Sequence, residues 1–288
     1  MTDRFGIGWR PELAAGILSN LERIDIVEVI ADDYFEASRT TRRALSTLAK
    51  QVPLALHGVT LGLASAVGVD QRRLERTARL IDEVQPEFWS EHLAFVRGGG
   101  IEIGHLAAPP RTDATIEGAA GNLRAARSIV GAMPLVENIA TLIDPPGSTM
   151  SEVDWTAMIV SETNCPMLLD LHNLYANSVN FGFDPYAYID RLPEERIRVI
   201  HLAGGRWIRT KSSKESRLLD DHLHDVPDEV YNLLSYVGQR VSHELTIILE
   251  RDGRYPPIEI LLAQLERART VLAGTRQQPP SQAHTEAA

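Results

Sequence analysis

The sequence predicts a single TIM-like (β/α)8 barrel, and three observations support that prediction. The chain has 288 residues, of which 44% are hydrophobic, and barrels of this type commonly run to roughly 250 residues. Short apolar runs rich in β-branched residues alternate with longer segments of helical periodicity, which is typical of parallel strands joined by crossover helices. This strand–helix unit recurs around the chain eight times, which favours closure into a barrel over an open sheet.

The expected elements follow this alternation. The apolar runs predict strands at Phe5–Trp9, Asp25–Ile30, Pro53–Gly58, Glu87–Leu93, Pro134–Ile139, Pro166–Asn173, Ile197–Gly204 and Leu245–Gly253. The periodic segments predict helices at 11–22, 39–51, 70–84, 115–131, 151–163, 184–192, 228–242 and 257–273. Asp70, Ser151 and Asp184 are suited to cap three helix N-termini.

One barrel domain is expected over residues 1–273. The polar, proline-containing tail at 274–288 predicts disorder. An open doubly wound sheet is the alternative fold, but no glycine-rich phosphate loop follows the first strand. The long connection at 203–227 is expected to be functional, because long loops in compact domains often are.

Composition excludes several classes of protein. The formal net charge is −10 and the pI about 5.4, which argues against a protein that grips nucleic acid through phosphates. The single cysteine, Cys165, excludes a disulfide framework and a cysteine-based zinc site. No apolar run approaches the ~20 residues needed to span a membrane. A cytoplasmic protein is expected, with no nucleic-acid partner and no membrane partner.

Polar side chains gather where the predicted strands end. The third to eighth strands end in LALHG, WSEHL, LVENI, LLDLHN, VIHLAG and IILERDG, and the long connection adds LLDDHLHD. Strand ends of a barrel point into its functional mouth. The residues concerned are His57, Glu91, His92, Glu137, Asn138, Asp170, His172, Asn173, His201, Asp220, Asp221, His222, His224, Glu250 and Asp252.

This joint pattern predicts a metal centre. Any one of these histidines or glutamates taken alone is more often a hydrogen-bonded or ion-paired core residue than a ligand. Six consecutive strands with such residues at the same end are not explained in that way, because a buried charge is costly unless it is paired or bound to a metal. Imidazole and carboxylate without thiolate suit zinc, iron or manganese. Glu137 is central in the strand order and could bridge two ions.

The same motifs resemble a known family, the multinuclear non-haem iron-dependent oxidative enzymes, formerly a family of unknown function. The matching strings are HGVTLGLAS, SEHLAF, VENI, LLDLHNLYANSVNFGFDP, IHLAGG, DDHLHDVPDEV and LERDG. The resemblance extends from about Phe5 to about Leu272, and it includes the methanobactin-biosynthesis type of oxidase. It implies a barrel similar to xylose isomerase and endonuclease IV.

The resemblance also implies ligands. His57, His92 and Glu137 would hold one iron, and Glu137 would bridge to a second. Asp170, His201 and Glu250 would complete that second site. A third site would use Asn173, Asp220 and His222. Strict strand alternation instead puts His172 on the face of Asp170, so His172 stays the alternative to Asn173.

This chain departs from the family around the third site. The family usually has two asparagines where His172 and Asn173 stand, an aspartate where Leu223 stands, and often a histidine where Gly205 stands. These departures concern the third ion and the substrate, and they leave the two-ion core unchanged.

The function implied by the resemblance is oxidative modification of a ribosomally made precursor peptide, commonly at cysteine, with two or three iron ions and dioxygen. A separate protein would deliver the peptide, and Asp252 is the candidate for proton transfer. Two alternatives are open: a metal-dependent sugar isomerase or phosphodiesterase on the same barrel, and a non-enzymatic scaffold that binds a peptide.

Overall fold

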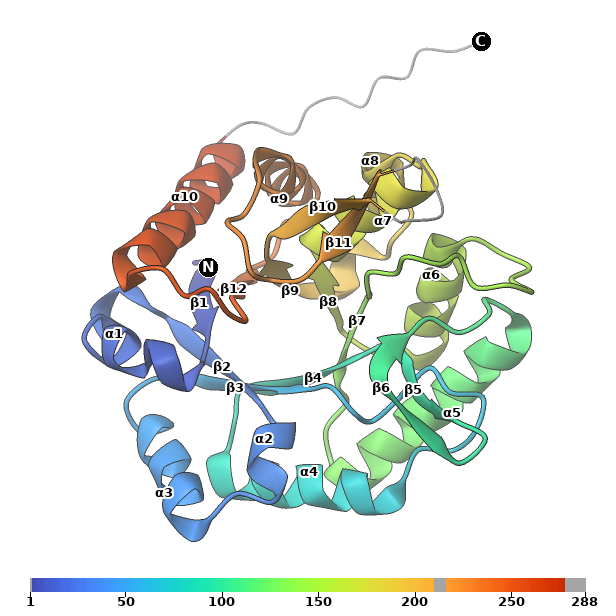
Figure 1. Cartoon of the computed structure of the whole chain (residues 1–288), viewed down its shortest axis with the longest axis horizontal. Helices are drawn as coiled ribbons and strands as arrows, with labels where there is room; N and C mark the ends of the chain where they lie inside the picture. The colour runs from blue at the N-terminus through green and yellow to red at the C-terminus, as the bar shows by residue number, and fades with distance from the viewer. Residues whose placement is uncertain (1, 210–215, 278–288) are drawn as a thin grey trace.

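The computed structural model of the chain describes residues 2–209 and 216–277, and it contains a closed barrel of eight parallel strands (Figure 1). The strands run around the barrel in the order β1-β12-β9-β8-β7-β4-β3-β2. Closure is direct, because β1 pairs with β12 in register, with Phe5 opposite Ile247. The barrel strands are β1 Arg4–Gly8, β2 Ile26–Ile30, β3 Leu54–Gly58, β4 Phe88–His92, β7 Leu135–Glu137, β8 Met167–Asp170, β9 Ile197–Leu202 and β12 Thr246–Leu249. The predicted fold class is therefore confirmed.

Helices surround the barrel and cover its outer face (Figure 1). Asp70, Ser151 and Asp184 accept the capping hydrogen bonds expected of them, from Arg72 N, Asp154 N and Tyr186 N respectively. The α-helices are α1 Ala14–Leu18, α2 Asp32–Phe35, α3 Arg39–Leu48, α4 Gln71–Val84, α5 Asp113–Val130, α6 Glu152–Thr163, α7 Leu171–Phe181, α8 Pro185–Asp190, α9 Asp228–Arg240 and α10 Ile258–Arg276. Short 3-10 turns occur at Pro11–Leu13, Leu21–Arg23 and Glu194–Arg196.

The predicted sixth strand, Pro166–Asn173, is wrong at its C-terminal end. Strand β8 stops at Asp170, and helix α7 begins at the next residue. Asp170 caps that helix, because its Oδ1 accepts a hydrogen bond from the backbone N–H of Asn173 at 2.6 Å. Helix α7 was not predicted separately. Its eleven residues lie immediately between the strand motif and the predicted helix at 184–192.

The predicted helix at 11–22 is also wrong in part. The segment is broken into the 3-10 turn 11–13, the helix α1 and the 3-10 turn 21–23. Gly16 lies inside α1, where a Cβ atom would come within 2.7 Å of Ile258 Cβ. The short helix α1 therefore packs closely against the start of α10.

Two β-hairpins lie beside the barrel mouth (Figure 1). The first pairs β5 Phe95–Gly98 with β6 Ile101–Ala107, and its turn is the glycine run at 98–100, with positive φ at Gly99 and Gly100. The second pairs β10 Gly205–Arg209 with β11 Ser216–Asp220. The connection expected to be a long loop at 203–227 therefore contains a hairpin, whose residues 210–215 lie outside the described residues.

The barrel interior is layered, and this layering positions the functional side chains. Inward-facing Leu135, Leu168, Val199 and Ile248 form a separate buried apolar cluster, against which Phe88 packs. Side chains alternate along a strand, so the residue two positions later points into the same interior one layer nearer the C-terminal end. Those residues are Glu137, Asp170, His201 and Glu250.

The C-terminal part of the chain is ordered beyond the expected domain end at residue 273. Helix α10 continues to Arg276, whose guanidinium donates to Asp3 Oδ1 at 3.0 Å and to His243 O at 2.8 Å. Residues 278–288 of the expected disordered tail lie outside the described residues. Within the described part of the chain, none of the helices has the length and apolar character to cross a membrane.

Candidate metal centre

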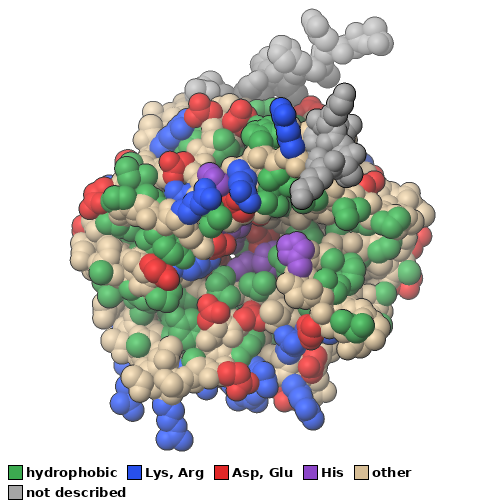
Figure 2. Space-filling view, viewed as in Figure 1, with side chains coloured by type: hydrophobic (Ala, Val, Ile, Leu, Met, Phe, Trp, Pro, Cys, Tyr) green, Lys and Arg blue, Asp and Glu red, His purple; other side chains and the backbone are tan. Residues whose placement is uncertain are grey.

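The structure brings the side chains predicted for the two-ion core together at the C-terminal end of the barrel. One buried group contains His57, His92 and Glu137, and a second contains Glu137, Asp170, His201 and Glu250. In each group the potential ligand atoms lie within 4.8 Å of one another. Figure 2 shows histidine and acidic side chains at the base of the hollow on this face. Six strands thus contribute to one compact cluster.

Glu137 is the centre of this cluster. Its Oε2 lies 3.3 Å from His57 Nε2 and 3.2 Å from His92 Nε2. Its Oε1 lies 3.3 Å from His201 Nδ1. The two carboxylate oxygens therefore face different sets of imidazoles, which is the arrangement expected of a carboxylate that bridges two ions.

The outer nitrogen of each core histidine is hydrogen-bonded, which fixes the nitrogen that faces the cluster. His57 Nδ1 lies 2.8 Å from Ser90 Oγ, and His92 Nδ1 lies 3.1 Å from Gly58 O. These partners direct the Nε2 atoms of both rings inward. His201 is reversed, and its Nδ1 faces Glu137. Such outer partners are typical of metal-binding histidines.

Glu28 is a cluster residue that the sequence analysis missed. It lies on β2 and is buried, and its Oε1 is 3.1 Å from His201 Nε2. Its spacing could have indicated this position. Glu28 follows the buried Ile26 by two residues, and the ligand candidates follow the residues of the apolar layer by the same spacing. It was overlooked because it lies inside a strand and not at its end.

His172 and Asn173, the two alternatives for the third site, lie differently relative to the cavity because helix α7 begins at Leu171. Asn173 lines the cavity at the mouth, and its Nδ2 donates to Asn138 O at 2.9 Å while its buried Oδ1 has no hydrogen-bond partner among the described residues. His172 is buried away from that cavity, and its Nδ1 donates to Asp220 Oδ1 at 2.6 Å. The turn into α7 thus directs residue 173 and not residue 172 toward the mouth.

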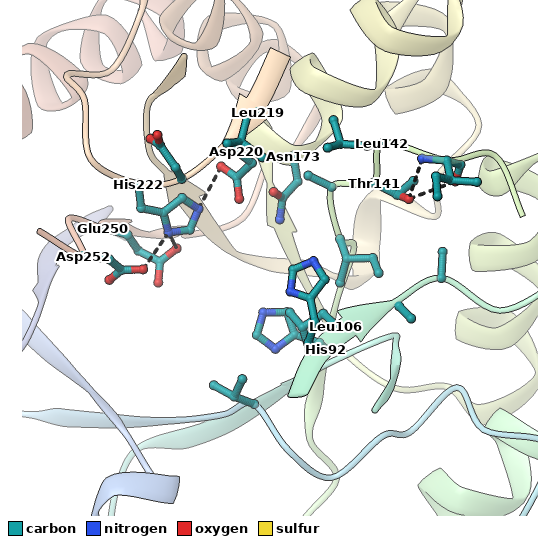
Figure 3. Close-up of a pocket in the computed structure, with 18 of the residues that line it drawn as sticks. His92, Leu106, Thr141, Leu142, Asn173, Leu219, Asp220, His222, Glu250 and Asp252 are labelled. Carbon is teal, nitrogen blue, oxygen red and sulfur yellow. Dashed lines mark hydrogen bonds and ion pairs between the residues drawn. The ribbon is translucent and has the colours of Figure 1, made fainter. Parts of the chain in front are cut away.

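Asp220, His222 and Asp252 form the next part of the mouth (Figure 3). His222 Nε2 lies 3.0 Å from Asp220 Oδ1, and His222 Nδ1 lies 3.2 Å from Asp252 Oδ2 and 3.5 Å from Glu250 Oε2. The His222 backbone has a φ of 51°, a left-handed conformation that is strained for a residue other than glycine.

Asp252, the candidate for proton transfer, is held in an ion-pair network. Arg10 Nε donates to its Oδ1 at 3.0 Å. Burial alone would raise the pKa of Asp252, but the hydrogen bond with His222 and the charges of His222 and Arg10 lower it below its ordinary value. The contacts of Asp252 with Arg10 and His222 suit it to orient the His222 ring.

Some strand-end residues face away from the cluster. Glu91 is buried and accepts hydrogen bonds from Leu61 N at 3.1 Å and His92 N at 2.9 Å. Asp221 pairs with His224 at 2.9 Å and with Arg206 at 3.1 Å. Asn138 exchanges two hydrogen bonds with the backbone of Asp170. These residues support the mouth without joining the candidate ligands.

The charges of the cluster fit a cation site. Burial opposes protonation of His92, but Glu137 and Glu91 outweigh it and raise the pKa of this imidazole to about 9. Burial raises the pKa of Asp170 well above its usual value, and the charge of Asp220 adds to this effect. Burying an uncompensated ion costs several kcal/mol. Bound cations would therefore offset the electrostatic repulsion among the carboxylates of Glu137, Asp170 and Glu250.

Unpaired buried atoms provide the direct test of that fit. Within the described residues, several buried polar atoms with no hydrogen-bond partner belong to this one region, although nearly all such atoms in proteins are paired. They are Glu137 Oε2, Asp170 Oδ2, His172 Nε2, Asn173 Oδ1, His201 Nδ1, Asp221 Oδ2 and His222 Nε2. Some of them, such as His222 Nε2 at 3.0 Å from Asp220 Oδ1, lie at ion-pair distance without a well-aligned hydrogen bond. Apart from His172 Nε2 and Asp221 Oδ2, each belongs to a predicted ligand, so the residues present fit a multinuclear metal centre.

A cavity of about 610 Å³ opens above the cluster, a size typical of ligand sites. One wall carries the charged groups Arg10, Asp220, His222, Glu250 and Asp252. The other is largely apolar and comes from β6 and the segment after β7, with Leu106, Ile139, Leu142 and Ile143 among its residues. Figure 3 shows Leu106 and Leu142 across the cavity from His222 and Asp252.

Comparison with solved structures supports the fold. The chain is similar to endonuclease IV from Thermus thermophilus, with a TM-score of 0.60 and 16% identity over 94% of this chain and 99% of that one. It is also similar to an L-ribulose 3-epimerase, with a TM-score of 0.59 and 12% identity over 96% and 95% of the two chains.

Comparison of sequences shows the family. The chain is 35% identical to a UPF0276 protein of Chromobacterium violaceum over 269 residues, which cover 93% of this chain and 95% of that protein. It is 32% identical to a UPF0276 protein of Caulobacter vibrioides over 95% of this chain and 96% of that one. Residues 4–273 match the family model described as RiPP precursor modification enzyme MbnB/TglH/ChrH. We conclude from this match that the chain belongs to the RiPP precursor modification enzyme family MbnB/TglH/ChrH.

Proposed function

We propose that this protein is an iron-dependent oxidase that uses dioxygen to modify a ribosomally made precursor peptide, with cysteine as the expected target. The observation that carries the proposal is the convergence of His57, His92, Glu137, Asp170, His201 and Glu250 on one buried point at the barrel mouth. Family membership supports a precursor peptide as the substrate. We further propose that a separate protein delivers this peptide.

The residues have distinct proposed roles. His57 and His92 would hold a first ion, His201, Asp170 and Glu250 would hold a second, and Glu137 would serve both. Asn173, Asp220 and His222 form a third position on the open side. When bound, iron ions would supply Lewis acidity and electron transfer.

The chain itself supplies orientation and exclusion of water. The apolar wall around Leu142 and Ile143 gives a peptide side chain a surface that excludes water, while the charged wall holds its polar groups. Asp252 holds the ring of His222 through Nδ1 at 3.2 Å and keeps Nε2 directed toward Asp220. A proton-transfer role for Asp252 stays a prediction.

The experiment compares metals and oxygen. The ligand set is nitrogen and oxygen only, which iron, zinc and manganese all accept, but zinc has no redox chemistry. The protein is reconstituted anaerobically with iron or with zinc and mixed with candidate precursor peptides encoded beside its gene. Oxygen uptake and the mass of the peptide are then measured. We expect uptake and a mass change with iron only, and ascorbate should sustain both.

A mass change that proceeds equally with zinc, or without oxygen, would refute the oxidase proposal. A metal-dependent hydrolase or isomerase on the same barrel would then be the better description. If the protein retained no metal after anaerobic reconstitution, a peptide-binding scaffold would be favoured instead.

A further inference from the structure

The candidate ligands come from two structurally different sources. Those of the two-ion core lie on barrel strands or directly after them, where the backbone is held on both sides by neighbouring strands. Asp220 instead is the last residue of β11, which pairs with β10 alone among the described strands. The position of its carboxylate therefore depends on how this two-stranded hairpin is attached to the barrel.

Helix α7 attaches the hairpin at two points. Near the start of the helix, His172 Nδ1 donates to Asp220 Oδ1 at 2.6 Å. Near its end, Asn180 Nδ2 donates to Leu218 O at 2.9 Å, and Asn180 Oδ1 accepts from Leu218 N at 2.8 Å. Both side chains are buried. These contacts fix the β11 backbone at Leu218 and its terminal carboxylate at Asp220.

Gly205 makes the first of these contacts possible. It is opposite Asp220 in the hairpin, and a Cβ atom there would lie 2.6 Å from His172 Cε1 and 2.2 Å from Leu219 O. Any side chain at this position would displace the imidazole or the strand. The structure therefore places Gly205 directly against His172.

The contact also determines which Asp220 oxygen is available. Its Oδ1 is within 2.6 Å of His172 Nδ1 and 3.0 Å of His222 Nε2. Figure 3 shows one oxygen of Asp220 joined to His222 and the other directed toward the cavity. His172 thus aims the remaining oxygen at the mouth without lining the mouth itself.

We propose that the third metal position forms only when the hairpin β10–β11 is docked onto α7 through His172 and Asn180. The two-ion core, by contrast, needs only the barrel. His172 and Asn180 are positioning residues in this account, because neither touches the cavity. This inference rests on the proposed metal centre. It adds that binding of the third ion depends on the hairpin β10–β11, which is not part of the barrel sheet.

The test counts ions in the full-length protein. The variants are His172→Asn, which shortens the side chain at the first attachment, and Asn180→Ala, which removes the second attachment. The matched control is Asn177→Ala. Asn177 is a buried asparagine of the same helix, but it donates to Ile139 O at 2.9 Å and accepts from Thr141 N, so it holds a different segment. Each protein is equilibrated anaerobically with ferrous iron at a series of free concentrations, and bound iron is measured by elemental analysis.

We expect wild type to bind three ions and both hairpin variants to bind the third about 10–100-fold more weakly, the usual cost of losing an outer-shell contact. Binding of the first two ions should be unchanged. Hydrogen exchange of the segment 216–220 should rise in both hairpin variants and stay at the wild-type rate in Asn177→Ala, a readout that does not depend on metal.

Retention of the third ion at wild-type affinity in both hairpin variants would overturn the proposal, as would equal loss in Asn177→Ala. Saturation of wild type at two ions would also overturn it while leaving the proposed two-ion core intact. Failure of wild type to bind any iron would refute the metal centre itself, so the two failures are distinguishable.

Discussion

The Nε2 atom of His201 lies 3.1 Å from Oε1 of Glu28, although the two residues are 173 positions apart in the sequence. Both side chains are buried in the barrel interior. This contact fixes His201 with Nδ1 toward Glu137 and adds a carboxylate that no part of the strand-end pattern predicts.

Glu28→Gln should weaken metal binding although the residue touches no proposed ion. Burial opposes protonation of His201, but the carboxylates of Glu250, Glu28 and Glu137 hold the pKa of this imidazole well above its usual value. Glutamine keeps a hydrogen-bond acceptor and removes the charge that makes the ring a stronger ligand. We expect metal affinity to fall about 10–100-fold, measured by competition with a chelating dye. Glu117→Gln, which changes an exposed glutamate of α5 far from the cluster in the sequence, is the control, and equal loss there would contradict the assignment.

Glu137→Ala should remove more metal than His222→Ala. Glu137 faces His57 and His92 with one oxygen and His201 with the other, so it serves two proposed ions. His222 serves one peripheral position. Elemental analysis of the two purified variants checks this expectation. Equal loss, or greater loss from the His222 variant, would show that Glu137 is not the bridge.

Metal should stabilise the fold. The candidate ligands come together only in the folded barrel, so ions bind the native state in preference to the unfolded chain. At a free metal concentration 100 times the dissociation constant, each site should add about 2.7 kcal/mol to the free energy of unfolding. Thermal denaturation with iron and with a chelator measures this difference, and identical midpoints would contradict it.

Arg111→Met should destabilise the protein through the segment that forms the apolar wall. The buried Arg111 donates to Asp144 Oδ1 at 2.8 Å and to Glu152 Oε2 at 3.1 Å. Its loss leaves Glu152 buried without its cationic partner, which typically costs 3–5 kcal/mol. Chemical denaturation provides the measurement, and Arg111→Met combined with Glu152→Leu should recover part of the loss.

The loss of folding stability caused by Arg111→Met should also increase with pH. Burial already raises the pKa of Glu152 above its ordinary value of 4.5, and removal of Arg111 raises it further. The folded state then keeps a proton that the unfolded chain releases, so stability falls as pH rises from the unfolded pKa through the folded one. Denaturation of wild type and variant at pH 4.5 and pH 7 tests this sign. A gap that narrows toward pH 7 would contradict it.

Duplex DNA should not bind in a salt-sensitive manner. The fold is similar to that of an endonuclease IV. However, the chain has a net charge of −10, whereas proteins that bind nucleic-acid phosphates usually carry a basic surface. A titration against duplex at several salt concentrations checks this, and a steep loss of affinity with salt would favour a phosphodiesterase function.

Strand periodicity was sufficient to predict the barrel and the polar residues at its strand ends, and the resemblance to the family selected the proposed two-ion ligands among those residues. The ends of β3, β4, β7, β8, β9 and β12 carry the polar residues, and parallel strands must bring those ends together. Glu28 was not predicted, because the sequence alone does not show whether an acidic side chain within a strand points into the barrel or lies in an ordinary ion pair.

Residues beyond the strands were harder to predict. The boundary at Asp170 depends on a capping hydrogen bond that decides between a longer strand and the helix α7, and local sequence permits both. The hairpin β10–β11 was read as a loop because the strand pairing of Gly205 with Asp220 joins segments of polar and mixed character. Contacts between distant segments, such as His172 with Asp220, leave no periodic signal in one sequence.

The layering inside the barrel has a consequence for folding. Leu135, Leu168 and Val199 each precede a proposed ligand by two residues on the same strand, and Ile248 precedes Glu250, the residue directly after β12, by the same spacing. A slip of one residue in any of these strands would turn both the apolar side chain and the ligand out of the interior together. Metal uptake would then fail along with the packing beneath it. A barrel with a misaligned strand should therefore stay metal-free, and the loaded cluster would mark those chains in which all contributing strands have reached their native alignment.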